Sequence, residues 1–199
     1  SLWNEKNNKF LESGDRYGLS KLAYNFLGGI MKSAASLSAF FNPTVNSFRR
    51  INAPPTKSGA SWSPSSISYT GNNRTHMIRI PDPGRFELRL MDGSSNPYLL
   101  QAGILAAGIN GMNMKLDPGE PLTCNMYTDY KNYPDLDRLP DDLEEALEKL
   151  DENQIDMATA ISGSGPGFIF NLIDAMEKAA IKLGFTKKTA NILVSQTFR

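Results

Sequence analysis

The chain has 199 residues, and its 21 basic and 21 acidic side chains cancel to a net charge of zero at pH 7. A neutral chain offers no overall field to attract nucleic acid or an anionic membrane, so both are disfavoured as partners. The single cysteine, Cys124, excludes a disulfide within the chain and favours a reducing, cytoplasmic setting.

The start of the chain and its longest apolar stretch show no targeting pattern. The longest apolar stretch, residues 98–109, is shorter than the roughly 20 residues that cross a bilayer. No charged-then-apolar leader opens the chain, so we expect no secretory signal. The chain begins at Ser1 instead of methionine, and we expect it to be a cut piece of a longer polypeptide.

The first half of the chain predicts one long helix, an irregular stretch and two short strands. Residues 19–40 place apolar side chains at helical spacing, which indicates an amphipathic helix that Asn42-Pro43 ends. Residues 53–73 are rich in Pro, Ser, Gly and Thr, and a loop of this length is usually functional or disordered. Residues 77–80 and 85–90 are typical of strands, with a Pro-Asp-Pro-Gly turn between them.

The next segment predicts a helix that is rich in alanine and glycine. Asn96 is a typical cap, Pro97 is a typical first residue, and the pattern continues to about Gly111. The small side chains would allow this helix to pack closely against a sheet. Residues 117–140 have little periodicity and predict a surface excursion.

The pattern in the last third of the chain indicates a charged helix followed by apolar ones. Residues 141–153 form a charged helical pattern, and its apolar stripe consists of Leu143, Leu147 and Leu150. Beyond it we expect a loop of small residues at 161–167, an apolar helix at 168–183 ended by Gly184, and a further helix at 187–198.

Charged side chains gather on the two predicted strands. The alternation of residues 85–90 puts Arg85, Glu87 and Arg89 on one face and their apolar neighbours on the other. Arg79 lies in the preceding strand, and Arg74 lies just before it. A generic strand of this kind has a solvated charged face. The alternative is an anion cradle, in which guanidinium groups bind phosphate or carboxylate and Glu87 holds a divalent metal.

Short motifs follow one another along residues 17–108. They are Tyr17-Gly18-Leu19-Ser20 with Phe26-Leu27-Gly28-Gly29; Asn42-Pro43-Thr44-Val45-Asn46-Ser47-Phe48-Arg49-Arg50; Asn73-Arg74-Thr75 with Ile78-Arg79-Ile80-Pro81; Arg85-Phe86-Glu87-Leu88-Arg89; and Asp92 with Asn96-Pro97-Tyr98-Leu99 and Leu105-Ala106-Ala107-Gly108. In this order they resemble the C-terminal part of the glutamine synthetase catalytic domain, at residues 1–152 of this chain. The number and order of the motifs make the resemblance specific.

The resemblance implies an α+β fold, part of the catalytic barrel with antiparallel strands and helices, and an ATP-dependent ligase. Such a ligase joins glutamate and ammonia through a γ-glutamyl phosphate, uses Mg²⁺ or Mn²⁺, and works as a homo-oligomeric ring. The roles carried over are glutamate binding for Arg50 and Arg89; catalysis for Arg74 and Arg79; ATP binding for Ser1, Arg74, Arg79 and Arg85; and metal binding for Glu87. These roles agree with the anion cradle, because phosphoryl transfer depends on positioning and charge neutralisation.

Departures from the family pattern qualify this expectation. The histidine and most of the glutamates that bind metal in the family, and its small N-terminal domain, would precede Ser1, so we expect the chain alone to be inactive. His76 matches no ligand position, and we interpret it as structural. Asn52 stands before Ala53-Pro54 where the family has a glutamate, and Asn cannot act as a base. Either the flap differs, or the amine is another one such as methylamine.

The last part of the chain, residues 153–199, resembles a different family. Ile155-Asp156 and the run Thr159-Ala160-Ile161-Ser162-Gly163-Ser164-Gly165-Pro166-Gly167-Phe168 are similar to the start of the dimerisation domain of pyrroline-5-carboxylate reductase. We therefore predict an all-α fragment of that domain at residues 153–199. A reductase would need a Gly-x-Gly-x-x-Gly turn between a strand and a helix, and no such pattern precedes residue 155.

Two rival functions stay open beside the ligase. One is a pyrroline-5-carboxylate reductase fragment of proline biosynthesis, and the other is a non-catalytic, truncated assembly module. Binding of magnesium-ATP separates the ligase from both. The junction near residues 150–156 predicts a gene fusion, a frameshift or an assembly artefact.

Overall fold

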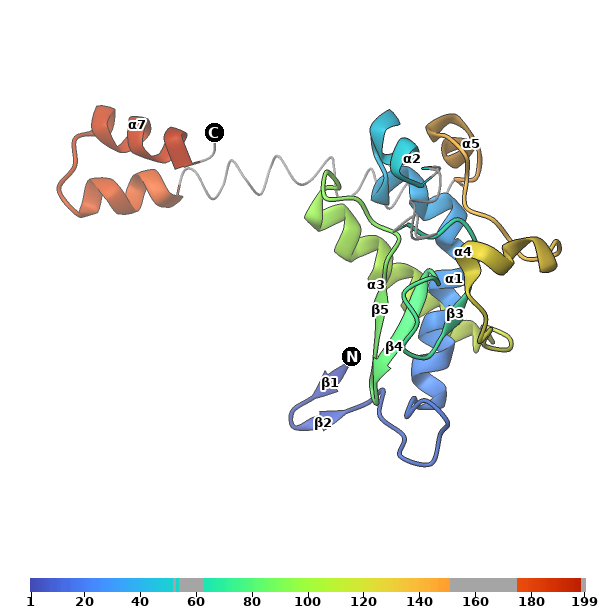
Figure 1. Cartoon of the computed structure of the whole chain (residues 1–199). Helices are drawn as coiled ribbons and strands as arrows, with labels where there is room; N and C mark the ends of the chain where they lie inside the picture. Colours follow the sequence, from blue (N-terminus) through green and yellow to red (C-terminus); the bar gives the residue numbers. More distant parts are fainter. Residues whose placement is uncertain (52, 54–62, 151–174, 198–199) are drawn as a thin grey trace. The chain divides into compact units, whose positions relative to one another are not determined.

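The computed structural model describes residues 1–51, 53, 63–150 and 175–197, and it divides the chain into two units at residues 1–151 and 152–199 (Figure 1). The helices of the first unit are α1 (Lys21–Phe41), α2 (Val45–Ile51), α3 (Pro97–Met114), α4 (Met126–Asp129), the 3₁₀ turn η1 (Tyr130–Asn132) and α5 (Leu143–Glu148). Its strands are β1 (Trp3–Asn4), β2 (Asn7–Asn8), β3 (Tyr69–Thr70), β4 (Ile78–Asp82) and β5 (Arg85–Leu88).

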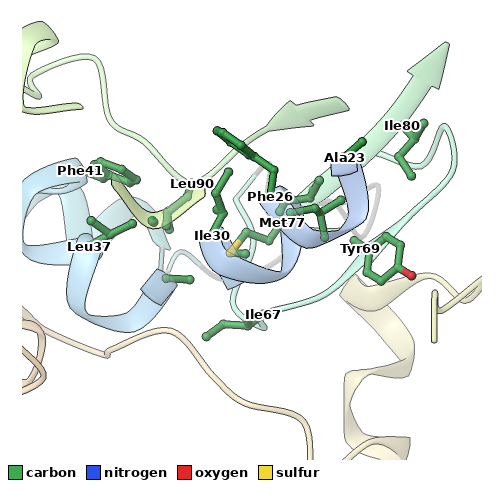
Figure 2. Close-up of a cluster of buried hydrophobic side chains, with 14 of the residues drawn as sticks. Ala23, Phe26, Ile30, Leu37, Phe41, Ile67, Tyr69, Met77, Ile80 and Leu90 are labelled. Carbon is green, nitrogen blue, oxygen red and sulfur yellow. The ribbon is translucent and has the colours of Figure 1, made fainter. Parts of the chain in front are cut away.

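Helix α1 is the centre of the first unit. Its cap is Ser20, whose hydroxyl accepts from the backbone N–H of Ala23, and it ends at Asn42 as the Asn-Pro signal predicts. Figure 2 shows side chains of α1, such as Phe26 and Ile30, packed with Met77, Ile80 and Leu90. The helix thus fixes the strands that carry the charged residues.

The strands form a three-stranded sheet of order β3-β4-β5. Strand β3 is parallel to β4, and β4 is antiparallel to β5, with Ile78 opposite Leu88 and Arg79 opposite Glu87. The predicted strands and turn are confirmed, although β4 extends to Asp82 and β5 ends at Leu88. Gly84 has φ +71° in the turn, a conformation that favours glycine.

Helix α3 begins as predicted, because Asn96 accepts from two backbone N–H groups of its first turn. The sequence suggested a sheet as its packing partner, but the main partner of α3 is helix α1. Gly29 and Gly111 lie at the crossing, and their small size lets the two backbones approach. Because α3 is apolar around its whole circumference, it must pack against another element, and the glycines let α1 pack closely against it.

Two further expectations need correction. Residues 117–140 are more than a surface excursion: Met126 and Leu139 are buried, and residues 65–67 exchange backbone hydrogen bonds with Asp137 and Leu139. In α5, which is shorter than residues 141–153, the buried residue is Ala146 and Leu147 is 53% exposed, so the predicted leucine stripe was partly wrong.

In the second unit, residues 175–182 are helical and precede helix α7 (Lys187–Thr197). Ala190 and Val194 of α7 are buried, and Asn191 donates to Glu177 at 2.6 Å, which joins the two helices. The small-residue loop predicted at 161–167 lies outside the described residues. None of the helices in the described part of the chain has the length and apolar character that a membrane span requires.

Candidate functional site

A cross-strand ion pair lies at the middle of the β4–β5 hairpin. Arg79 Nη2 donates to Glu87 Oε2 at 2.7 Å, because the register puts the two residues directly opposite each other. Arg79 Nη1 also donates to Asn72 Oδ1 at 2.8 Å. The Arg79 Nε is buried and has no hydrogen-bond partner among the described residues.

The charge around Glu87 is positive. The hydrogen bond from Arg79 is the largest cause that lowers the pKa of Glu87, and the charges of Arg79, Arg89 and Arg74 lower it further. The same bond raises the pKa of Arg79. The structure therefore brings together four of the residues predicted from the sequence, Arg74, Arg79, Glu87 and Arg89.

Arg50 reaches this cluster from helix α2. Its Nη1 donates to Ser63 Oγ at 3.1 Å, and its Nη2 donates to Asn42 Oδ1 at 2.9 Å and to the carbonyl of Leu90 at 2.8 Å. Its Nε lies 3.8 Å from Asp92 Oδ2. Burial lowers the pKa of Arg50, the Asp92 charge opposes this, and the charge of Arg89 adds to it. Arg50 is thus adjacent to Arg89 and already holds protein acceptors.

Arg85 and Ser1 lie apart from that cluster, at the turn end of the hairpin. Arg85 Nε donates to Asp82 Oδ2 at 2.8 Å, and both side chains are more than half exposed. Ser1 Oγ accepts from the indole N–H of Trp3 at 3.1 Å. The charge of Arg85 acts on the backbone nitrogen of Ser1, so these two residues are neighbours.

A group of polar contacts that the sequence did not predict holds the turn before β4. The carbonyl of Cys124 accepts from Asn73 Nδ2 and from His76 Nε2, each at 3.0 Å. The His76 Nδ1 lies 3.0 Å from Ser68 Oγ, the side chain is fully buried, and burial lowers its pKa. His76 is therefore structural in the sense predicted. The only available signal was the turn-forming pair Asn72-Asn73.

Glu87 is the single acidic side chain of the predicted site set that faces the arginine cluster. Among residues 1–51, 53, 63–150 and 175–197, no three His, Cys, Asp or Glu side chains form a group that could hold a metal ion. Glu87 can thus supply one carboxylate ligand, but the described residues do not make a metal site by themselves. The sequence prediction for Asn52 lies outside the described residues.

Two family models match the chain. "Glutamine synthetase, catalytic domain" matches residues 1–164, and "Pyrroline-5-carboxylate reductase dimerisation" matches residues 152–199. Both resemblances drawn from the sequence motifs are thereby confirmed.

Curated relatives cover the same part of the chain. A glutamine synthetase of Rhizobium meliloti is 53% identical over 147 residues, which are 74% of this chain and 34% of that protein. A glutamate–methylamine ligase of Methyloversatilis universalis is 42% identical over 160 residues, 78% of this chain and 36% of that protein. The chain thus spans about a third of the length of the curated relatives it matches.

Solved structures support the fold. A GmaS/ADP complex is 45% identical, with a TM-score of 0.66 over 80% of this chain and 39% of that chain. A GmaS structure without ligand is 41% identical, with a TM-score of 0.67 over 89% of this chain and 39% of that chain. The predicted α+β class with a helical C-terminal region is confirmed.

Proposed function

The chain belongs to the glutamine synthetase family, and from this premise we propose that it contributes the arginine-lined part of the active site of an ATP-dependent glutamate ligase. The product is glutamine, formed from glutamate and ammonia through a γ-glutamyl phosphate. Because the chain covers about a third of its relatives, we propose this activity for the intact ligase and expect the 199-residue chain to bind ligands without turnover.

The observation that carries the proposal is the Arg79–Glu87 pair, flanked by Arg74 and Arg89. Phosphates and carboxylates are bound most firmly by guanidinium groups that are partly removed from water. Arg79 meets this condition, since its side chain is 13% exposed, its backbone lies in strand β4, and its guanidinium donates to Asn72 and Glu87. A phosphate oxygen would take the place of the Glu87 carboxylate as the acceptor for Arg79.

The reaction has two chemical steps, and in both of them negative charge develops on phosphoryl oxygens. In the first, a γ-carboxylate oxygen of glutamate attacks the γ-phosphorus of ATP, and the bond from that phosphorus to the ADP oxygen breaks. In the second, the amine nitrogen attacks the γ-carbonyl carbon, the carbon–oxygen bond to phosphate breaks, and the nitrogen loses a proton. Arg74 and Arg79 would orient the phosphoryl group and stabilise its charge.

Of the remaining arginines, two would serve the glutamate substrate and one would bind ATP. Arg89 would bind a glutamate carboxylate directly. Arg50 would add mainly charge, because its terminal nitrogens already donate to the protein. Arg85 and Ser1 are neighbours at the other end of the hairpin, which fits contact with a different part of the ATP molecule.

We include Mg²⁺ or Mn²⁺ in the proposal, with Glu87 as one ligand and the others supplied from outside the described residues. Such an ion would neutralise charge on the ATP phosphates. A reducing, cytoplasmic location agrees with the free Cys124. One similar protein is named for methylamine as its amine substrate, so the assays should compare ammonium with methylamine.

The test is calorimetric titration of the full chain with magnesium-ATP. We expect binding that weakens at least about tenfold in Arg79→Ala, in line with the loss of a charge-assisted hydrogen bond. Arg49→Ala is the matched control, because its guanidinium contacts Asn46 on its own helix. Absence of magnesium-ATP binding, or equal weakening in both variants, would count against the proposal. In the intact ligase, phosphate release with glutamate and each amine then identifies the preferred amine.

A second role, association of the tail with another copy of the chain, is supported by apolar exposure in the second unit. Leu183 is 80% exposed, and the other exposed apolar side chains there are Ile181, Phe185, Ile192 and Leu193. A helical pair with so little internal core is typical of a surface that another chain covers. With the second family match, this supports a domain division at about residue 152 and a homo-oligomer.

Light scattering after size exclusion measures this association. The full chain should form at least dimers, and a Leu183→Glu and Leu193→Glu double variant should be monomeric. Lys187→Glu, a polar change on the same helix pair, should leave the mass unchanged. A chain that stays monomeric at high concentration would refute the tail as an assembly module without affecting the ligase proposal.

A further inference from the structure

The turn that carries Arg74 is fastened to a segment fifty residues away. Asn73 and His76 both donate to the carbonyl of Cys124, and the backbone N–H of Met126 donates to Thr75 Oγ1 at 3.0 Å. Within the turn, the Thr75 hydroxyl and backbone N–H both donate to Asn73 Oδ1. The residues directly before and after Arg74 in the sequence are therefore both held by hydrogen bonds.

The segment is itself anchored in the core. Met126 is 4% exposed, and its helix α4 is capped by Asn125. His76 is fully buried, and its two ring nitrogens are both engaged. Because a carbonyl can only accept, His76 carries its proton on Nε2, and Nδ1 accepts from the Ser68 hydroxyl. The imidazole thus links the Cys124 segment to the residue that precedes β3.

The same residues hold Arg89. The guanidinium of Arg89 donates to the carbonyl of His76 at 3.4 Å, and its backbone N–H donates to the carbonyl of Met77 at 2.9 Å. The same turn therefore positions both arginines. Arg74 is part of the turn, and Arg89, which follows strand β5, is hydrogen-bonded to it. A side chain that must meet a substrate phosphate or carboxylate within a fraction of an ångström needs such support.

We propose that residues Cys124–Met126 form a clamp that positions Arg74 and Arg89 for their anionic ligands, with Asn73, Thr75 and His76 as positioning residues. The clamp acts through the backbone of the turn and touches no ligand itself. This inference rests on the proposed function for its biological meaning, while its geometry can be tested without that function.

The cleanest perturbation is at Thr75, where two variants separate the effect of side-chain shape from that of hydrogen bonding. Thr75→Val keeps the side-chain volume and removes the hydroxyl, whereas Thr75→Ser keeps the hydroxyl and loses only a methyl group. Thr128→Val is the control, because within the described part of the chain its hydroxyl bonds only to Asn125 and Asp129 of its own turn. A second disruption, Asn73→Asp, keeps the acceptor for Thr75 and loses the donor to Cys124.

Two measurements on the full chain are needed. The first is the NMR signal of the guanidinium Nε–H groups of Arg74 and Arg89, assigned by Arg→Lys substitution. It should shift and broaden in Thr75→Val and Asn73→Asp, and it should return to the parent position in Thr75→Ser. The second is magnesium-ATP affinity by calorimetry, which should fall about tenfold in the two disrupted variants, as expected for misplaced binding groups.

The outcomes separate the two hypotheses. If the parent chain binds no magnesium-ATP but the arginine signals shift as described, the clamp stands and the ligase proposal fails. If the disrupted variants fold and their arginine signals match those of the parent and of Thr128→Val, the clamp is refuted. Equal loss of affinity in Thr75→Ser and Thr75→Val would also refute it, because the hydroxyl would then be irrelevant. If Thr75→Val does not fold, Asn73→Asp gives the same comparison.

Discussion

The crossing of α1 and α3 gives a stability prediction that can be worked from distances. A Cβ atom added to Gly111 would lie 2.2 Å from the carbonyl oxygen of Asn25 and 2.6 Å from Gly29 Cα. Both neighbours belong to the backbone of α1, so no rotation of a side chain can make room. The Gly111→Ala variant must therefore push the two helices apart along their whole contact.

Two opposing effects set the size of the change. Overpacking of this kind costs roughly 1–3 kcal/mol, and the rigid backbone contact argues for the upper end. Alanine in place of glycine returns about 1 kcal/mol of helix propensity. We therefore expect a net loss of about 2 kcal/mol, which lowers the melting temperature of a domain of this size by roughly 4–8 °C.

Gly103→Ala on the same helix is the matched control. Its Cβ would meet Leu37 Cδ2 at 3.0 Å and Phe41 Cε1 at 3.2 Å, and these are side-chain atoms that can shift. The helix-propensity gain should then offset most of the crowding, so the net change should stay within about 1 kcal/mol. Urea unfolding followed by far-ultraviolet circular dichroism measures both. If Gly111→Ala were as stable as Gly103→Ala, the assignment of the crossing as a backbone-limited contact would be refuted.

Three more perturbations test the site and its supports. Arg79→Ala should raise the pKa of Glu87 towards its ordinary value, because the hydrogen bond from Arg79 is the largest cause of its lowering; a carbon-13 titration of the carboxyl checks this, and Arg49→Ala should leave that pKa unchanged. Stability should decline as the pH falls below the ordinary His76 value of 6.5, because burial lowers the folded pKa and the unfolded chain takes up the proton first. Urea unfolding from roughly pH 5 to 8 should show this slope, reduced in His76→Gln, and equal slopes would contradict the explanation. Asp142→Ala should cost about 1 kcal/mol by removing the N-cap of α5, and an unchanged urea midpoint would show that the cap is not needed.

Local sequence patterns predicted the helices and strands well where the structure depends on residues that are close together in the sequence. The 3.6-residue spacing of apolar side chains predicted α1, because one face of that helix is buried over its full length. The Asn96-Pro97 pair predicted the start of α3, because a cap is a contact between near neighbours. The alternation along β5 predicted that Glu87 would share a face with the arginines, and the register placed it opposite Arg79.

Contacts between distant residues could not be predicted in this way. The hydrogen bonds that join residues 73–76 to Cys124 and Met126 involve polar atoms some fifty positions apart, and they leave no periodic trace. The same is true of Arg50, whose donation to the carbonyl of Leu90 depends on how α2 meets the end of the sheet. The packing partner of α3 was also beyond the pattern, since small residues indicate close approach without saying to what.

The charge balance of the cluster explains why binding and stability should be linked in this protein. Arg50, Arg74, Arg79 and Arg89 carry four positive charges and Glu87 and Asp92 carry two negative ones, so 4 − 2 leaves a local surplus of +2 in a chain whose net charge is zero. Such a surplus lowers the stability of the fold by self-repulsion, while hydrogen bonds to protein acceptors hold the guanidinium groups of Arg50, Arg79 and Arg89. An anionic ligand removes the repulsion only in the folded state, so part of its binding free energy appears as stability. The proposed phosphate and carboxylate site predicts this link between anion binding and stability, whereas a merely solvated strand face would gain no stability from such ligands.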